Sequence, residues 1–368
     1  MQLRGRKQVV TAGGAFIAMA LLAACSSSSS SSSSGATSPT TGAGSSSSAA
    51  AASGTINASG STFQTNFQQT AIAAFKAADP GITVNYGGGG SGKGRTDLAA
   101  GTVMFAGSDT APIPAAETAN FKGKDVLYFP VQIGPIAIAY NLSGVTGLKL
   151  DAPTLAGIFQ GTIKTWNDPA IKALNAGANL PSTSITLAVR SDSSGTTQNF
   201  TKFLTEAAPG WKLGSGSTVK FPATAHAASG GSGVAQAVKS TAGAIGYVDD
   251  STANASGLSA ASIKNKDGQF VAPSPDSATA AATSVTPTAA LTFSAAWQPG
   301  AAAYPITYQS YDLVYAKQAS ANDAALLKAY LGFLLGQQGQ ALLKPLFLAP
   351  LPQSIDTAAV AQLDKITS

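Results

Sequence analysis

A strand that runs into a helix through a polar turn is the most constraining feature of this sequence. The apolar run 185–189 is followed by Arg190–Thr196 (RSDSSGT) and then by apolar residues at helical spacing over 200–207. The first N–H groups of a helix lack partners within the helix, so backbone and hydroxyl donors gather at such a junction. Arg190 adds a fork suited to two oxygens of a tetrahedral anion, and Asp192 is close enough in sequence to hold it. The segment predicts an oxyanion pocket, with an ordinary serine-capped helix as the alternative.

Length and charge narrow the class of protein. The 368 residues suffice for two domains, and only 11% are charged, so polar contacts must come mainly from hydroxyls, amides and backbone. Removal of the basic N-terminal residues Arg4, Arg6 and Lys7 lowers the count of 22 basic residues to 19 against 17 acidic ones, a balance of +2. This composition has no basic surface for nucleic acid.

The N-terminus has the pattern of an export signal. Residues 1–24 combine a basic start with the apolar core 15–22, which is too short to span a bilayer. Leu22-Ala23-Ala24-Cys25 resembles the lipobox of bacterial lipoproteins. We expect Cys25 to carry a lipid and to hold the mature protein on the outer face of the cytoplasmic membrane. A conventional secreted protein is the alternative.

A flexible tether is expected over residues 25–54. This segment consists almost entirely of Ser, Ala, Thr and Gly, with unbroken serine from Ser26 to Ser34, and it has no means of burying a core. A glycosylated or wall-spanning stalk fits the same composition. Cys25 is the only cysteine, which excludes an internal disulfide.

Two further turns could approach an anion. Ser61 and Thr62 precede apolar residues at helical spacing, which predicts a helix capped by one of these hydroxyls. The strand-like run 82–86 enters the glycine-rich segment 87–94. This segment resembles a phosphate-binding P-loop, but Gly94 stands where that motif requires Ser or Thr, so we do not assign a nucleotide site. The glycines still let backbone N–H groups and the Ser91 hydroxyl come close to an anion.

Other residues carry weaker signals. Asp109 ends the apolar run 103–108, where an acid alone is usually a turn former or a helix cap. His226 is the only histidine, so we predict no metal cluster and no catalytic relay, and we assign it a surface or structural role. Strands are expected at 126–131 and 136–141, and a hairpin at 263–271.

Several separated motifs occur in the order seen in phosphate-binding proteins of bacterial ABC transporters, and the chain resembles that family from Thr55 to its C-terminus. These motifs are Gly60–Phe63, Tyr86–Ser91, Gly107–Asp109, Arg190–Thr196, Gly216–Lys220 and Gly243–Val248. The resemblance implies an α/β, two-lobe periplasmic-binding-protein clamshell, type II-like, with hinge crossovers near Gln132 and Tyr304. Lobe I would comprise residues 55–132 and 305–368, and lobe II residues 133–304.

The resemblance also implies a phosphate site and a transport role. The ligand contacts would come from Thr62, Phe63 through its backbone, Ser91, Asp109, Arg190, Ser194, Gly195 through its backbone, and Thr196. Asp192 would orient Arg190, and no cofactor is implied. The partners would be inorganic phosphate and the permease and ATPase of an ABC importer, which would recognise the closed form. The sequence departs from the family at Gln64, where proline is common, and at Lys93, where a small residue is common.

The chemistry of Asp109 accounts for selection of phosphate. Phosphate retains a proton at neutral pH and can donate it to a carboxylate, whereas sulfate cannot. An anion without that proton would leave the buried carboxylate unpaired, at a cost of about several kcal/mol.

Other functions remain as alternatives. An exported phosphohydrolase would need a metal cluster or an activated nucleophile, and the sequence has one histidine, one cysteine and no Gly-x-Ser-x-Gly elbow, so we predict that the chain is not an enzyme. A second alternative is a binder of sulfate, molybdate or a phosphonate. A third is a surface lipoprotein that uses the fold as a scaffold.

Overall fold

A computed structural model of the chain describes residues 52–368. The expected export signal, the lipidated Cys25 and the tether as far as residue 51 lie outside the described residues. The first strand begins at Gly54, the last residue of the expected tether. Within residues 52–368, every helix falls short of the length and apolarity needed to cross a bilayer.

One mixed sheet organises the fold, with strand order β2-β1-β3-β12-β4-β8-β6-β7 and β9 paired to β4. Its strands are β1 (Gly54–Gly60), β2 (Ile82–Gly87), β3 (Phe105–Ser108), β4 (Val126–Tyr140), β6 (Thr186–Arg190), β7 (His226–Ala228), β8 (Ala244–Asp249), β9 (Ser259–Ala260) and β12 (Thr307–Tyr315). β1 runs parallel to β2 and β3, and β6 runs parallel to β7 and β8. Since each parallel pair needs a crossover, helices are interleaved with these strands.

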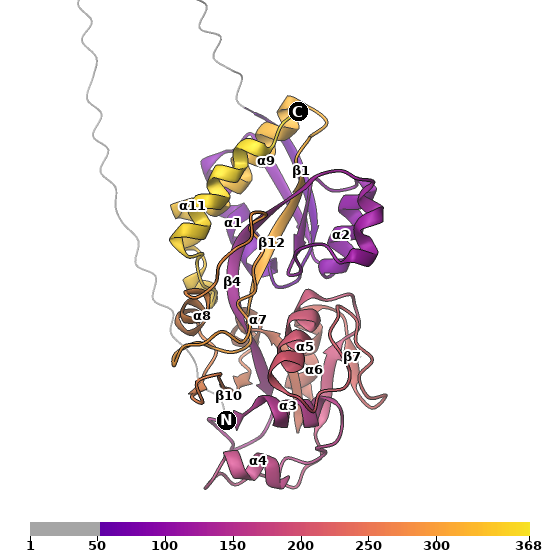
Figure 1. Cartoon of the computed structure of the whole chain (residues 1–368), viewed down its shortest axis with the longest axis vertical. Helices are drawn as coiled ribbons and strands as arrows, with labels where there is room; N and C mark the ends of the chain where they lie inside the picture. Colours follow the sequence, from indigo (N-terminus) through magenta and orange to yellow (C-terminus); the bar gives the residue numbers. More distant parts are fainter. Residues whose placement is uncertain (1–51) are drawn as a thin grey trace, which may run out of the picture. The chain divides into compact units, whose positions relative to one another are not determined.

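The strand β4 divides this sheet into two regions. Residues 126–135 pair with β12, and residues 136–140 pair with β8. We call β1, β2, β3, β12 and residues 126–135 the first sheet region, and residues 136–140 with β6, β7 and β8 the second. Figure 1 shows β4 passing from the upper, indigo part of the described chain into the lower, pink part.

The expectation of two separate strands at 126–131 and 136–141 is wrong. The structure has one strand through Pro130 and Pro135, and the register with β12 shifts between Ser310 and Tyr311. Proline cannot donate to a ladder, but a local irregularity accommodates it, and the residues from Phe129 to Tyr140 are buried without interruption.

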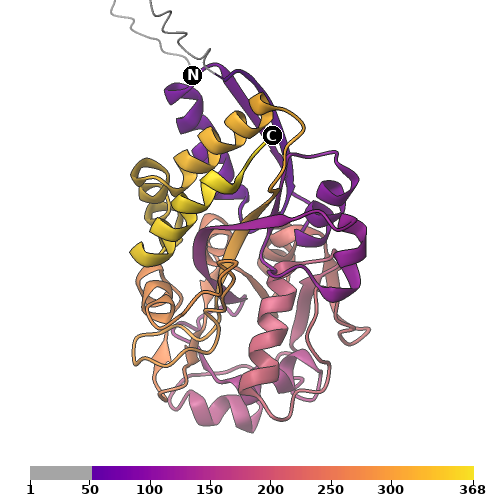
Figure 2. The ribbon, with the colours of Figure 1, turned by 45° about the horizontal axis from the view of Figure 1, so that its top comes forward.

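Helices surround the sheet. They are α1 (Thr65–Ala78), α2 (Ser91–Ala100), η1 (Ala115–Phe121), α3 (Ala152–Phe159), α4 (Pro169–Leu174), α5 (Gly195–Ala207), α6 (Gly230–Ser240), α7 (Asp250–Ala255), α8 (Pro275–Ala282), α9 (Ala321–Leu335), α10 (Gln337–Ala341), η2 (Lys344–Leu346), α11 (Gln353–Gln362) and η3 (Leu363–Lys365). Figure 2 shows the yellow C-terminal helices lying against the indigo N-terminal elements. The aromatic rings of Phe75 and Phe105 both pack on Tyr330 of α9, which ties these ends of the chain together.

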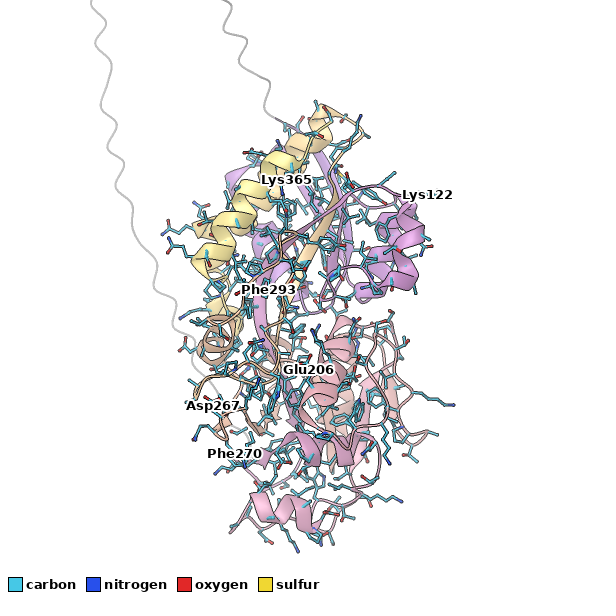
Figure 3. The ribbon with its side chains drawn as sticks, in the orientation of Figure 1. Lys122, Glu206, Asp267, Phe270, Phe293 and Lys365 are labelled. Carbon is cyan, nitrogen blue, oxygen red and sulfur yellow. The ribbon has the colours of Figure 1, made fainter. Side chains whose placement is uncertain are left out.

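The expected hairpin at 263–271 is present. It joins β10 (Ser262–Lys264) to β11 (Phe270–Val271), and β10 also pairs with β5 (Lys149–Leu150) in a small second sheet. Figure 3 labels Asp267 and Phe270 of this hairpin, at the lower left of the view. Asn265 Oδ1 accepts from the backbone N–H groups of Asp267 and Gln269, which closes the turn.

Candidate anion-binding site

Asp109 lies immediately after β3 with its side chain buried among hydroxyl groups. Its Oδ1 accepts hydrogen bonds from Ser61 Oγ at 2.6 Å and from Ser310 Oγ at 2.5 Å. Its Oδ2 accepts from Ser91 Oγ at 3.3 Å, and Ser91 begins α2. Burial raises the pKa of the Asp109 carboxyl above its usual value, although these hydroxyls and the charge of Arg190 offset part of that rise.

Arg190 ends β6 in the second sheet region and is 7% exposed. Its Nε donates to Asp192 Oδ1 at 2.7 Å, and its Nη2 donates to Asp192 Oδ2. Burial alone would raise the pKa of Asp192, but the hydrogen bonds and charge of Arg190 outweigh it and lower that pKa. Asp192 Oδ1 also accepts from the Gly230 N–H at 3.0 Å, so the carboxylate links Arg190 to the start of α6.

The first turn of α5 packs directly against Asp109. Ser194 caps this helix, because its Oγ accepts from the Thr197 N–H at 3.1 Å. A Cβ on Gly195 would lie 2.4 Å from Ser91 Oγ and 2.7 Å from Asp109 Oδ2, so only glycine fits. The next residue, Thr196, is buried. The serine cap is therefore present, and the helix start that it caps lies against the Asp109 carboxyl group.

Helices and loops beside the first sheet region contact those beside the second, around this turn. Asn199 Nδ2 of α5 donates to the backbone oxygen of Asp109 at 2.8 Å. The Gly92 N–H donates to the Ser193 oxygen at 3.1 Å, and Asn66 Nδ2 donates to Ser251 Oγ at 2.9 Å. These bonds join α1 and α2 to the loop before α5 and to α7.

The turn before α1 contains two of the expected contact residues, Thr62 and Phe63. Thr62 is half-buried, and its Oγ1 accepts from the Gly231 N–H of α6 at 3.3 Å. The Phe63 N–H, expected to face the anion, donates to Ser61 Oγ at 3.1 Å, and the Phe63 ring stacks on Tyr308.

The expected cap of α1 is wrong. Gln64 occupies the N-cap position without a side-chain cap bond. The Ser61 hydroxyl instead contacts Asp109, far away in sequence, and therefore does not cap the helix.

Several residues at the site were not among those expected. They are Ser61, Asn199, Gly230, Gly231, Tyr308 and Ser310. The glycine-rich start of α6 was visible in the sequence, and Ser61 lies in a recognised motif. Ser310 has no local signal, because only the pairing of β12 with β3 brings it to Asp109.

Lys93 and His226 lie apart from these contacts. Lys93 Nζ pairs with Asp97 Oδ2 at 2.5 Å within α2, and its side chain is 53% exposed. The Lys93 side chain therefore lies on the exposed surface of α2. His226 is exposed on β7. Within residues 52–368, the structure has no cluster of three or more His, Cys, Asp or Glu arranged to hold a metal ion.

Comparisons with known proteins identify relatives over most of the chain. The family model described as PBP superfamily domain matches residues 45–338. Phosphate-binding protein PstS 3 of Mycobacterium leprae is 38% identical over 324 residues, covering 83% of this chain and 86% of the relative. Phosphate-binding protein PstS 2 of Mycobacterium tuberculosis is 35% identical over 332 residues, covering 85% and 87%.

Solved structures share the fold. A periplasmic phosphate-binding protein, PfluDING, solved with phosphate, has a TM-score of 0.71 at 23% identity and covers 84% of this chain and 94% of its own. A putative phosphate ABC transporter substrate-binding protein from Clostridium perfringens has a TM-score of 0.60 at 17% identity, with coverage of 81% and 100%. The expected α/β periplasmic-binding-protein fold is thereby confirmed. The chain belongs to the PstS family of phosphate-binding proteins.

Proposed function

We propose that this protein is an extracytoplasmic receptor that binds inorganic phosphate between two lobes and delivers it to an ABC importer. The observation that carries the proposal is the buried Asp109 carboxylate, which meets the first turn of α5 beside Arg190. The lobes would be residues 55–132 with 305–368, and residues 133–304, close to the place where β4 changes partners.

The ligand would be held mainly by neutral donors. We assign its contacts to Thr62, Phe63, Ser91, Asp109, Arg190, Ser194, Gly195 and Thr196, with Asp192 holding Arg190. The N–H groups at the start of α5 carry partial positive charge, and Arg190 adds one full charge. Because the Phe63 N–H bonds to Ser61 Oγ, its contact with the ligand requires that bond to be shared or broken.

Selectivity would come from Asp109. The carboxylate accepts a hydrogen bond from a protonated oxygen of phosphate, while a fully deprotonated anion offers it none. Asp109 would then face an anion oxygen of like charge with no proton between them, which costs on the order of several kcal/mol at a desolvated contact, so sulfate and molybdate should bind poorly.

Binding and release fit this site better than the exported phosphohydrolase. The relatives bear the names of binding proteins, and the contacts around Asp109 are hydroxyls, an amide and backbone groups. The only imidazole of the chain, that of His226, lies exposed on β7.

The location of the protein is part of the proposal. Export directed by residues 1–24, lipidation at Cys25 and a tether to residue 54 would keep the receptor at the outer face of the cytoplasmic membrane, within reach of the permease. Membrane fractionation tests the anchor: Cys25→Ser should move the protein from the membrane to the soluble fraction, and retention on the membrane would contradict it.

Calorimetric titration of the purified protein with phosphate, arsenate and sulfate tests the binding proposal. Phosphate and arsenate, which both carry a proton at neutral pH, should bind, and sulfate should bind at least about tenfold more weakly. Asp109→Asn should narrow the preference for phosphate over sulfate. Equal binding of sulfate, or no binding of phosphate, would overturn the proposal.

A further inference from the structure

A chain of buried side chains leads from Asp109 to α1. Ser310 Oγ of β12 donates to Asp109 Oδ1 at 2.5 Å, and Gln64 Nε2 donates to Ser310 Oγ at 2.8 Å. The side chains of all three residues are 2% exposed or less, so water does not compete for these bonds.

The orientation of the Gln64 amide is determined by its other partners. Its Nε2 also donates to the Tyr311 backbone oxygen at 3.0 Å, and a carbonyl oxygen can only accept. Its Oε1 accepts from Gln68 Nε2 at 3.1 Å. The Tyr330 hydroxyl in turn donates to Gln68 Oε1 at 2.6 Å. Gln64 therefore presents an N–H to Ser310, and the single hydroxyl proton of Ser310 goes to Asp109.

Ser61 is committed in the same way. Its Oγ accepts from the Phe63 N–H, so its hydroxyl proton is free to go to Asp109 Oδ1. Oδ1 thus receives two short hydroxyl bonds, which occupy both lone pairs available to it. Oδ2 receives only the 3.3 Å bond from Ser91 Oγ and lies beside Gly195. Oδ2 is the oxygen with capacity left for a ligand proton.

We infer that Gln64 and Ser310 are positioning residues that keep Asp109 an ionised acceptor and reserve Oδ2 for the proton of the bound oxyanion. This inference rests on the proposed binding of phosphate. It makes the two residues determinants of the preference for phosphate over sulfate, although neither is assigned a contact with the ligand. Without them, Asp109 could take up a proton and donate it to an anion oxygen, which would favour sulfate.

The charges around Asp109 are compatible with this role. Arg190, Tyr86 and Tyr308 are the titratable or charged groups that interact with it electrostatically. Asp312, at the far end of the chain of amides, accepts from Gln68 Nε2 at 3.3 Å, and burial raises its pKa to about 8. Asp312 is therefore mainly neutral at pH 7 and adds little negative charge.

The test compares Ser310→Ala with a matched control, Thr307→Val. Thr307 is a fully buried residue of the same strand whose hydroxyl donates to the Tyr304 oxygen, apart from Asp109. Calorimetry would measure the dissociation constants for phosphate and sulfate at pH 6, 7 and 8. We expect Ser310→Ala to lower the sulfate-to-phosphate ratio of dissociation constants at least about tenfold, since a hydrogen bond to a charged group is lost. Thr307→Val should keep the ratio of the unmodified protein.

The pH series adds a readout that a purely structural role would not change. Loss of the Ser310 bond raises the pKa of Asp109 further. As the pH is lowered, Asp109 should therefore become protonated, and phosphate affinity should begin to fall, at a higher pH than in the unmodified protein. An unchanged profile together with an unchanged ratio would overturn the inference and leave the proposed function intact. Failure of the unmodified protein to bind phosphate would overturn both.

A second variant guards against misfolding of the first. Gln64→Met removes the donor to Ser310, and Gln340→Met is its control, because Gln340 donates only to the Val131 and Leu334 oxygens of the backbone. Gln64→Met should lower the ratio about threefold, by freeing the Ser310 hydroxyl to turn away. In the Ser310→Ala background this effect should vanish. A ratio unaffected by Gln64→Met, in a variant that retains its circular dichroism spectrum, would also overturn the inference.

Discussion

Arg190 is the one full positive charge among the proposed ligand contacts, and the structure holds it firmly. Its guanidinium meets Asp192 through two nitrogens, and its side chain is 1% exposed. The ordering cost of the long side chain is therefore met before a ligand arrives, which favours tight binding. A fixed fork can also select the oxygen geometry of the anion.

Replacement of Arg190 should abolish most of the affinity. Arg190→Ala removes a charge-assisted contact and leaves Asp192 without its charged partner, so phosphate should bind at least about a hundredfold more weakly. Arg190→Lys keeps the charge without the guanidinium fork, so its phosphate affinity should lie between those of Arg190→Ala and the unmodified protein. Titration calorimetry measures both, with Lys202→Ala on α5 as a control, because Lys202 is half-exposed in a loose 3.9 Å pair with Glu206. Wild-type affinity in Arg190→Ala would place the site elsewhere.

Local patterns in the sequence mark some residues of the candidate site, whereas strand pairing brings in others that no local pattern marks. Arg190, Ser194 and Asp109 stand in turns next to apolar runs, so a pattern in the sequence marks them. Ser310 is an ordinary polar residue inside a strand, and its contact with Asp109 depends on Tyr311 pairing with Ser108. That register is a property of the assembled sheet.

Among the elements, α5 does most to shape the site. Its apolar face is buried, with the Phe200 ring stacked on Tyr247 of β8 and the Phe203 ring packed against Trp297, so its start is held in place. The absence of a Cβ at Gly195 then allows that start to approach Ser91 and Asp109. A helix start offers N–H groups only where the backbone can come this close.

Gly195→Ala should impair binding without unfolding the protein. Alanine is the better helix former, but its Cβ would lie 2.4 Å from Ser91 Oγ and would hold α5 away from α2. We expect phosphate affinity to fall by about tenfold or more, with a small change in the unfolding midpoint. The control is Gly210→Ala, where a Cβ would meet no atom within 4 Å. If the two variants bind phosphate equally well, binding does not require the close approach of α5 to Ser91 and Asp109.

β4 and the start of α1 both differ from the local preference of their sequences. Two strands were expected at 126–131 and 136–141 where the structure has one, and Ser61 or Thr62 was expected to cap α1, where no side-chain cap is present. In both places tertiary contacts override the local preference: β4 is buried against neighbours on both sides, and Ser61 bonds to Asp109. The hairpin over 263–271 was predictable because its turn is closed by the neighbouring Asn265.

For the molecule as a whole, buried carboxyl groups couple stability to pH. Burial raises the pKa of Asp249 to about 6, of Asp250 to about 7 and of Asp312 to about 8. Because these values exceed the unfolded value of about 4, the folded state binds more protons between pH 4 and 8. The free energy of unfolding should therefore fall as pH rises through this range, through these groups.

Asp312→Asn should weaken that dependence. The amide keeps an oxygen for Gln68 Nε2 but does not titrate. Between pH 5 and 8 the pH dependence of the variant's free energy of unfolding should therefore correspond to up to about one bound proton fewer. At pH 8 the variant should be the more stable by on the order of 1 kcal/mol or more. Urea unfolding at several pH values measures this, with the exposed Asp364→Asn as control. A slope equal to that of the unmodified protein would show that Asp312 does not titrate in this range.

Closure of the proposed lobes should be visible as protection of individual amides. The N–H groups of Gly92 and Gly231 donate across the two sheet regions, to the Ser193 oxygen and to Thr62 Oγ1. A ligand that contacts both regions stabilises the state in which these bonds exist, by its difference in affinity for the closed and open states. Saturating phosphate should therefore slow hydrogen exchange at both amides by about tenfold or more, measured by NMR.

The control is the Trp166 N–H, which donates to the Thr183 oxygen. Both residues lie within the proposed second lobe, so exchange at this amide should change far less. Equal slowing at all three amides would indicate general stabilisation without closure, and no slowing at Gly92 and Gly231 would mean that phosphate does not bridge the two regions.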